Sequence, residues 1–171
     1  GPMLASAIRQ FVNEVAWGAL DYLVIDLPPG TGDVHISIAQ TANVSGIVIV
    51  TTPQEVSLSD CRKAVNMFAM QGINIPILGV VENMAYFTPA ELPDNKYYIF
   101  GKGGGRKISE EFHIPFLGEV PIYQSIQEGG DSGIPAVLND GEDALAFRDI
   151  AKTIAQQIAM MNAKLEPSAS S

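Results

Sequence analysis

The sequence contains one cysteine, Cys61, among its 171 residues. A single cysteine excludes an internal disulfide framework and a metal site built from several thiolates of one chain. No apolar run approaches the roughly 18 residues that cross a bilayer, and the first residues lack the basic and then apolar order of a secretory signal. We therefore expect a cytoplasmic protein without a membrane segment.

Basic residues are also few. Ten Lys and Arg stand against 19 Asp and Glu, which gives a net charge of −9. Nucleic-acid binding needs clustered Lys and Arg to neutralise phosphates, so this balance argues against it. Hydrophobic residues make up 47% of the chain, which is typical of a folded domain. We expect one domain over residues 1–166 and a frayed tail over 167–171.

Four short apolar runs predict β-strands. None of them alternates apolar with polar residues, which is typical of parallel strands that are buried on both faces. The runs are DYLVID (21–26), GIVIVT (46–51), IPILGVV (75–81) and IPFLGEV (114–120).

Between these runs, apolar residues recur at helical spacing. They predict helices over 4–15, 58–68 and 147–161. Asp33 is expected to cap a helix over 34–43, and Asp140 or Gly141 is expected to open the last helix. Since helices and strands alternate, we predict an α/β fold. It would be a doubly wound, mostly parallel sheet with helices on both faces, as in Rossmann-like folds.

The segment 83–105 is too long for an ordinary connection between a strand and a helix. It contains several prolines and then KYYIF (96–100), which predicts a short strand. We expect this excursion at the carboxyl edge of the sheet, where α/β proteins bind their ligands, and we expect it to form a partner or dimer surface.

The stretch DYLVIDLPPGTGD (21–33) has the composition of half a nucleotide site. Asp26 ends the predicted strand, and a carboxylate there needs a positive partner, which in P-loop NTPases is Mg²⁺. Pro28 and Pro29 stiffen the following turn, and Gly30 allows its N–H to approach a terminal phosphate oxygen. The alternative is a carboxylate that only caps a strand before a tight turn. The flanking strand and helix favour the nucleotide site.

The other half of such a site, a G-x-x-x-x-G-K-[ST] loop, is absent. FGKGGGRKIS (100–109) fails the pattern, since Arg106 stands where the second glycine belongs. A glycine-rich turn that opens a helix near Arg106 fits better, although its amides could contact an anion. We therefore expect that these residues are the C-terminal part of a longer P-loop protein, and that they are inactive alone.

Several blocks together carry a family resemblance. They are WGALDYLVIDLPPGTGD (17–33), TTPQEVSLSDCRKAVNMF (51–68), ILGVVENMAYF (77–87), FGKGGG (100–105) and IPFLGEVPIYQSIQEGGDSGIP (114–135). In this order and spacing the chain resembles the Mrp/ApbC iron–sulfur cluster carrier ATPases, in the ParA/MinD branch of P-loop NTPases. The resemblance implies ATP and Mg²⁺ as cofactors, hydrolysis of ATP, a homodimer, and an iron–sulfur apo-protein or scaffold as partner.

The resemblance also implies roles for individual residues. Asp26 would hold Mg²⁺ directly or through water, and Gly30 would contact the γ-phosphate beside Pro29. Asn83 would hydrogen-bond the adenine, since an amide both donates and accepts. Pro121 would lie in the loop beside the base, and Thr52 would line the cleft. The alternatives are a turn-capping role for Asn83 and an ordinary strand end for Pro121.

The sequence departs from this family at one point. Many members carry C-x-x-C after ENM-x-YF, and thiolates are the ligands of [4Fe–4S] clusters. Here the matching segment is TPAELPDNKYY, and Cys61 falls on a predicted apolar helix stripe, so a bound cluster is doubtful. His35 and His113 are isolated, and neither is assigned to a metal.

This departure leaves a second function open. The protein would then be a nucleotide-controlled dimerising switch or scaffold ATPase that carries no cluster. A stand-alone dinucleotide-binding domain is a weaker third reading, because no strand is followed by G-x-G-x-x-G.

Overall fold

The computed structural model describes residues 2–28, 30, 32–89, 91, 92 and 94–165. Pro29, Thr31 and the tail 167–171 therefore lie outside the described residues. Along the chain the elements are α1 (Pro2–Asn13), α2 (Asp33–Thr41), β1 (Ile47–Thr51), α3 (Glu55–Ala69), β2 (Ile77–Phe87), α4 (Gly104–Phe112), β3 (Phe116–Ile122), α5 (Gln124–Ser132), the 3₁₀ turn η1 (Ala136–Leu138) and α6 (Glu142–Leu165).

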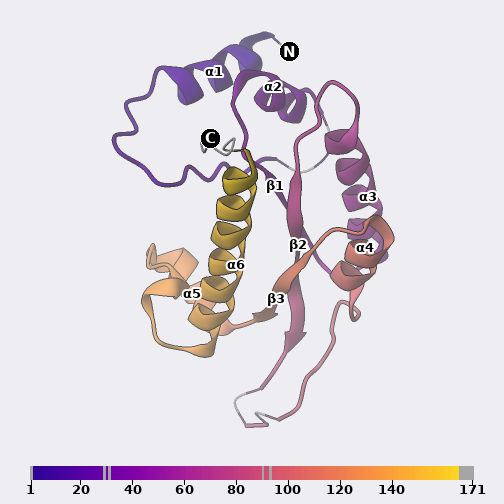
Figure 1. Ribbon diagram of the computed structural model, residues 1–171. Coiled ribbons are helices and arrows are strands. Elements are labelled where there is room, and N and C mark those ends of the chain that lie inside the picture. The colour runs from indigo at the N-terminus through magenta and orange to yellow at the C-terminus, as the bar shows by residue number, and fades with distance from the viewer. Residues whose placement is uncertain (1, 29, 31, 90, 93, 166–171) are drawn as a thin grey trace, which may run out of the picture.

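The three strands form one parallel sheet in the order β1-β2-β3, with helices on both faces (Figure 1). Successive side chains of a strand point to opposite faces. Val80 of β2 accordingly packs with Leu58 of α3 and Ile108 of α4. Its neighbour Val81 packs with Ile150 of α6. The predicted parallel α/β architecture is confirmed.

Two glycines allow the strands to pair closely. Gly79 and Gly118 have φ values of 153° and 154°, a region that only glycine adopts readily. The register shifts beside each of them, so that one extra residue bulges out of the strand. A Cβ on Gly79 would lie 2.5 Å from the carbonyl oxygen of Pro115. Glycine is therefore required at this point of β2.

The prediction of a strand over 21–26 is wrong. Residues 22–28 have no regular secondary structure, and the side chains of Leu23, Val24 and Ile25 are 45%, 89% and 42% exposed. An apolar run becomes a strand only where it lies beside the hydrogen-bonding edge of another strand. The described sheet contains β1, β2 and β3 alone, so this segment pairs with no strand among the described residues and leaves the outer edge of β1 open.

The expectation that every strand is buried on both faces also fails for β1. Val50 is 60% exposed, because α6 packs on β2 and β3. The strand expected over 96–100 is reduced to a single antiparallel bridge between Phe87 and Tyr97. In this segment Tyr97 alone pairs with a residue of β2, which is too little to form a strand.

The predicted helices are present, with corrections at their ends. Gly32, not Asp33, is the N-cap of α2, and no side chain caps it. Asp33 instead lies in the first turn, where a negative charge favours the helix dipole. The last helix begins at Glu142, directly after Gly141. On α1, Phe11 is 63% exposed, so the predicted apolar stripe is not buried there.

Candidate functional site

Three of the positions proposed for nucleotide binding lie at neighbouring strand ends. Thr51 of β1 pairs with Glu82 of β2, which places Thr52 beside Asn83. Asn83 in turn pairs with Val120 of β3, directly before Pro121. Because the strands are parallel, their carboxyl ends share one edge of the sheet. The structure therefore brings Thr52, Asn83 and Pro121 together.

Asn83 lies where the ladder between β2 and β3 is interrupted. The pairing shifts between Asn83 and Phe87, and Met84 has a left-handed φ of 55°. The Asn83 side-chain oxygen accepts a hydrogen bond of 2.9 Å from the Met84 N–H. Such a backbone, sparsely populated for a residue other than glycine, is frequent at ligand sites. Among the described residues, the N–H donors of the Asn83 amide have no hydrogen-bond partner and remain available to a ligand.

Thr52 and Pro53 form the turn from β1 into α3. The Thr52 hydroxyl lies 2.7 Å from that of Ser57, so the two share a hydrogen bond across the first turn of the helix. Pro53 is buried against the glycine loop: a Cβ on Gly104 would lie 2.8 Å from the Pro53 carbonyl oxygen. These contacts fix the edge that carries Thr52.

Glu82 is a buried carboxylate that the sequence analysis did not single out. Only 1% of the residue is exposed, and its two oxygens accept hydrogen bonds from Gly103 N at 3.3 Å and Gly105 N at 2.5 Å. These amides begin α4, where the helix dipole favours a negative group. The amides of Gly103 and Gly105 are therefore occupied by the protein's own carboxyl group and do not serve a phosphate. The sequence offered one sign of this role, because Glu82 directly follows the apolar run GVV and a charged residue there needs a buried partner.

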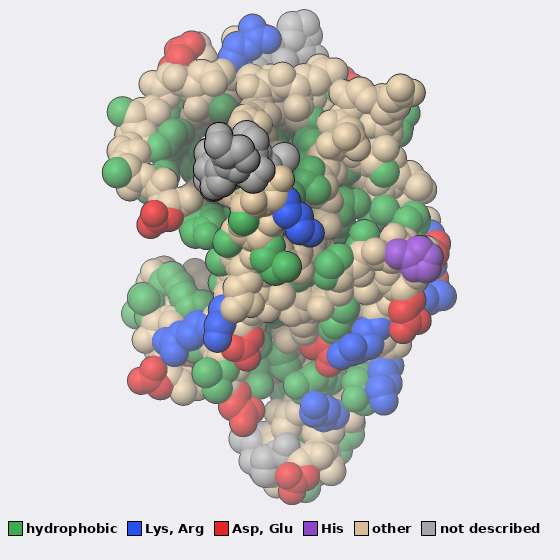
Figure 2. All heavy atoms as spheres, viewed as in Figure 1, with side chains coloured by type: hydrophobic (Ala, Val, Ile, Leu, Met, Phe, Trp, Pro, Cys, Tyr) green, Lys and Arg blue, Asp and Glu red, His purple; other side chains and the backbone are tan. Residues whose placement is uncertain are grey.

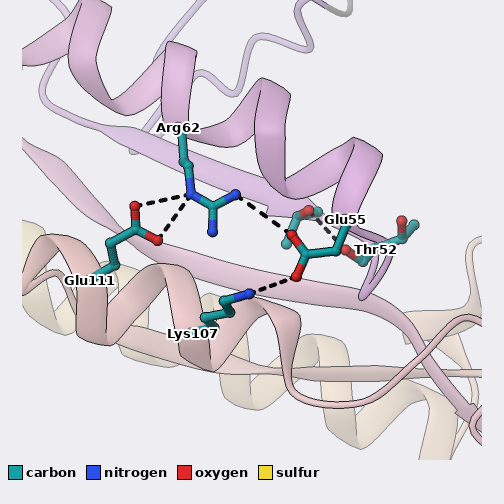
Figure 3. A network of polar contacts seen from close by, with 6 residues as sticks. Thr52, Glu55, Arg62, Lys107 and Glu111 are labelled. Carbon is teal, nitrogen blue, oxygen red and sulfur yellow. Dashed lines mark hydrogen bonds and ion pairs between the residues drawn. The ribbon is translucent and has the colours of Figure 1, made fainter.

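A polar network joins α3 to α4 (Figure 3). Arg62 donates two hydrogen bonds of 3.0 Å to Glu111 and lies 3.8 Å from Glu55, which pairs with Lys107 at 2.6 Å. The hydrogen bond from Lys107 lowers the pKa of Glu55, and the hydrogen bond to Glu111 raises the pKa of Arg62. Each exposed pair contributes little, but together they orient the two helices that cover one face of the sheet.

Beyond β3, two acidic residues of α6 hold the start of α5. The Ser125 hydroxyl donates a 2.6 Å hydrogen bond to Asp143, and this bond lowers the pKa of that carboxyl. Burial, followed by the nearby charge of Glu142, raises the pKa of Tyr123 to about 12. Tyr123 is therefore a neutral hydrogen-bond donor near neutral pH, beside Pro121.

Asp26 and Gly30 belong to the connection between α1 and α2. Both are exposed, and Gly30 has a φ of 103°. Their segment follows α1 and leads into α2, and in Figure 1 these two helices lie at the end of the sheet away from the arrowhead of β2. The structure thus groups Thr52, Asn83 and Pro121 at the strand ends, whereas Asp26 and Gly30 belong to the connection between α1 and α2. Pro29 is outside the described residues.

The side chains that could hold a metal do not converge. No group of three or more His, Cys, Asp or Glu lies close enough in the described part of the chain. Cys61 is buried in the core between α3 and the sheet, and burial raises the pKa of its thiol. Iron–sulfur ligands are thiolates, so Cys61 does not fit that role. His35 is buried with its Nδ1 atom unpaired, and His113 ends α4.

An open apolar pocket of about 440 Å³ lies between α5, η1 and α6. Its lining offers no charged side chain that could bind a phosphate; the lining residues are Ile126, Gly129, Gly130, Gly133, Pro135, Ala136, Val137 and Phe147. Among the described helices, none is both long enough and apolar enough to cross a membrane.

Comparison with known proteins identifies relatives over nearly the whole chain. A family model described as ParA, NUBPL iron-transfer P-loop NTPase, matches residues 1–159. An iron–sulfur cluster carrier protein of Synechocystis is 51% identical over 162 residues, which are 94% of this chain and 45% of that protein. The iron–sulfur cluster transfer protein NUBPL of Mus musculus is 41% identical over 92% of this chain and 49% of its own length.

Solved structures agree with these relatives. A nucleotide-binding protein from Archaeoglobus fulgidus, solved in complex with ADP, has 41% sequence identity and a TM-score of 0.68, over 77% of this chain and 53% of that one. The cell division ATPase MinD of Pyrococcus furiosus, at 23% identity and a TM-score of 0.61, matches 90% of this chain and 57% of its own; this likeness concerns the fold. The chain spans about half the length of the curated relatives it matches.

Proposed function

Because the chain belongs to the ParA family of NUBPL-type iron-transfer P-loop NTPases, we propose that it is part of a Mg²⁺- and ATP-dependent ATPase that acts in iron–sulfur cluster assembly and transfer. The family match over residues 1–159 carries this proposal. The ADP complex of a 41% identical protein supports a nucleotide as ligand. The whole protein's activity remains part of the proposal, since this chain spans half of its relatives.

The base of the nucleotide would bind at the strand ends. The Asn83 side-chain N–H would donate a hydrogen bond to a ring nitrogen of adenine. The second lone pair of its side-chain oxygen would accept a hydrogen bond from the exocyclic amine. Pro121 would form an apolar wall beside the adenine ring. Thr52, which follows β1, would line the site on the other side of β2. The support is their common edge and the N–H donors that Asn83 leaves available.

Asp26, Pro29 and Gly30 would serve the phosphates. Mg²⁺ at NTPase sites is commonly bound by one or two carboxylates together with the substrate's phosphates, and one exposed Asp fits that donor set. When bound, Mg²⁺ would neutralise charge on the transferred phosphate. The Gly30 N–H would donate to a γ-phosphate oxygen, and a proline at position 29 would limit the backbone freedom of the residue before it. ATP hydrolysis is then phosphoryl transfer to water, favoured mainly by positioning and charge stabilisation.

For this to occur, the Asp26 segment must reach the nucleotide. Its apolar side chains Leu23, Val24 and Ile25 are exposed, and contiguous apolar surface commonly marks a contact area. We propose that this run packs into the sheet of the full-length protein. Such packing would bring Asp26 towards the nucleotide.

The iron–sulfur cluster would be cargo. Carrier and transfer proteins among the relatives support this role, and a homodimer with an iron–sulfur apo-protein or scaffold as partner is part of the proposal. The single cysteine is buried, so cluster thiolates would have to come from outside residues 1–171. That observation favours a second candidate, a nucleotide-controlled dimerising switch that carries no cluster.

The ATPase proposal is tested by Asp26→Ala in the full-length protein. We expect ATP turnover to fall at least about a hundredfold, because charge stabilisation in phosphoryl transfer contributes several kcal/mol. Asp21→Ala removes a carboxylate from the same exposed segment and is the matched control, with turnover unchanged. Equal turnover in the Asp26 variant and the unmodified protein would remove Asp26 from the mechanism.

The two candidate functions are separated by cluster uptake. The full-length protein is incubated with iron and sulfide without oxygen, and absorption in the visible range and transfer to an apo-acceptor are measured. Uptake with transfer supports the carrier. ATP hydrolysis without cluster uptake supports the switch. If the protein shows neither hydrolysis nor uptake, both candidate functions are contradicted.

A further inference from the structure

The segment after β2 forms an exposed surface that combines tyrosines, apolar side chains and lysines. We call it the tyrosine–lysine surface and define it by Met84, Tyr86, Lys96, Tyr97, Tyr98, Ile99 and Lys102. Tyr97 and Ile99 are 46% and 60% exposed, and Met84 is 42% exposed. Tyrosine and methionine are enriched at protein–protein interfaces, whereas a solvated loop rarely exposes so many large side chains together.

This surface is held in place by its backbone. Phe87 and Tyr97 exchange two hydrogen bonds, of 2.9 and 2.8 Å, between their peptide groups. At the other end, Glu82 binds the amides of Gly103 and Gly105. Both ends of the segment are thus fixed to β2. A preformed surface loses less conformational entropy on binding than a flexible loop does.

The two lysines of the surface differ from most basic residues around them. Arg62, Lys63, Arg106 and Lys107 each pair with a carboxylate. Lys96 and Lys102 instead lie over tyrosine rings, with their Nζ atoms 4.0 Å from the centre of Tyr86 and 4.6 Å from that of Tyr98. Among the described residues, neither has an ion pair. Figure 2 shows Lys and Arg side chains, interspersed with Asp and Glu, over α4 and the segment that precedes it.

We propose that the tyrosine–lysine surface docks an acidic segment of a partner protein, with apolar side chains that pack against Tyr97 and Ile99. Lys96 and Lys102 would bind the carboxylates. Their positions over the rings orient the ammonium groups, and the partner supplies the negative charge that pairs with them. The proposal goes beyond the proposed function, because such docking requires neither nucleotide nor cluster.

Other occupants fit less well. Nucleic acid would meet a protein of net charge −9, with only two uncommitted cations among the described residues of this surface. A second copy bound through the same surface would bring four lysines, Lys96 and Lys102 of both copies, into one interface, and the residues that define the surface include no carboxylate to pair with them. An acidic protein segment avoids both conflicts.

The test uses the full-length protein and a short fluorescein-labelled peptide rich in Glu and Asp with two Leu. Binding is followed by fluorescence anisotropy at low and at physiological salt. The double variant Lys96→Glu, Lys102→Glu should bind at least about tenfold more weakly than the unmodified protein. The matched control Lys152→Glu, Lys164→Glu makes the same charge change on α6 and should bind as the unmodified protein does. Thermal unfolding by circular dichroism verifies that both variants fold.

Tyr97→Ala separates docking from charge attraction alone, and should weaken binding severalfold with the lysines intact. The proposal is overturned if both double variants lose affinity equally, if the peptide does not bind the unmodified protein at millimolar concentration, or if single-stranded DNA binds more tightly than the peptide. It is also overturned if sedimentation shows that self-association covers the surface and that Lys96→Glu, Lys102→Glu abolishes it.

Discussion

Replacing Gly79 by alanine should destabilise the protein strongly, because two separate effects act at that position. Its φ of 153° lies in a region that other residues avoid, and strain of this kind costs about 1–3 kcal/mol. The new Cβ would also lie 2.5 Å from the Pro115 carbonyl oxygen and 2.6 Å from Leu117 Cγ, and overpacking costs about 1–3 kcal/mol.

Together these effects predict a loss of about 4 kcal/mol. For a chain of this length each kcal/mol lowers the melting temperature by about 2–4 °C, so we expect a fall of roughly 8–16 °C. Circular dichroism during heating measures it, and urea unfolding gives the free energy independently.

Two further glycines serve as controls. Gly72 has a φ of 99°, and a Cβ added there would meet nothing within 4 Å, so Gly72→Ala should show strain alone, about 2 kcal/mol. Gly130 lies in α5 with ordinary φ and open space, and Gly130→Ala should stabilise by about 0.5–1 kcal/mol. If Gly79→Ala proves no more harmful than Gly72→Ala, the close approach of β2 to the chain before β3 is wrong.

Three other predictions follow from buried or hydrogen-bonded groups. Glu82→Gln should speed hydrogen exchange of the Gly105 amide at least about tenfold by NMR, since charged hydrogen bonds contribute about 1.5–3 kcal/mol; an unchanged rate would contradict the contact. The lowered pKa of Asp143 stabilises the fold above its unfolded pKa of about 3.9, and this stability is lost as the pH falls through the folded value. Ser125→Ala should therefore flatten the dependence of melting temperature on pH below about pH 4. The thiol of Cys61, buried and with a raised pKa, should react with a disulfide reagent at neutral pH far more slowly than in urea, and similar rates would argue against its burial.

Sequence patterns predicted correctly those β-strands whose neighbouring strands are also part of the described sheet. The runs at 46–51, 75–81 and 114–120 became β1, β2 and β3, because each is next to another strand and under a helix. The run at 21–26 is just as apolar, yet it is not a strand. Apolar character predicts burial, whereas a strand also needs a hydrogen-bonding neighbour, and no local pattern reports one.

The candidate site was predictable in part for the same reason. Thr52, Asn83 and Pro121 follow from strand ends, and parallel pairing brings strand ends together. Glu82 was missed because its role depends on the amide of Gly105, 23 positions away. A glycine-rich loop indicates that another group approaches its backbone closely. The sequence does not say whether that group belongs to a ligand or to a side chain of the protein itself.

The open side of β1 has a practical consequence for work in solution. Its outward peptide groups have no strand beside them in the described part of the sheet, and Val50 presents an apolar side chain next to them. Strand edges of this kind recruit strands from other molecules. Concentrated samples should therefore associate edge to edge, and Val50→Lys should keep them monomeric in light scattering without altering the melting temperature by more than about 2 °C, as exposed substitutions rarely cost more than about 0.5 kcal/mol.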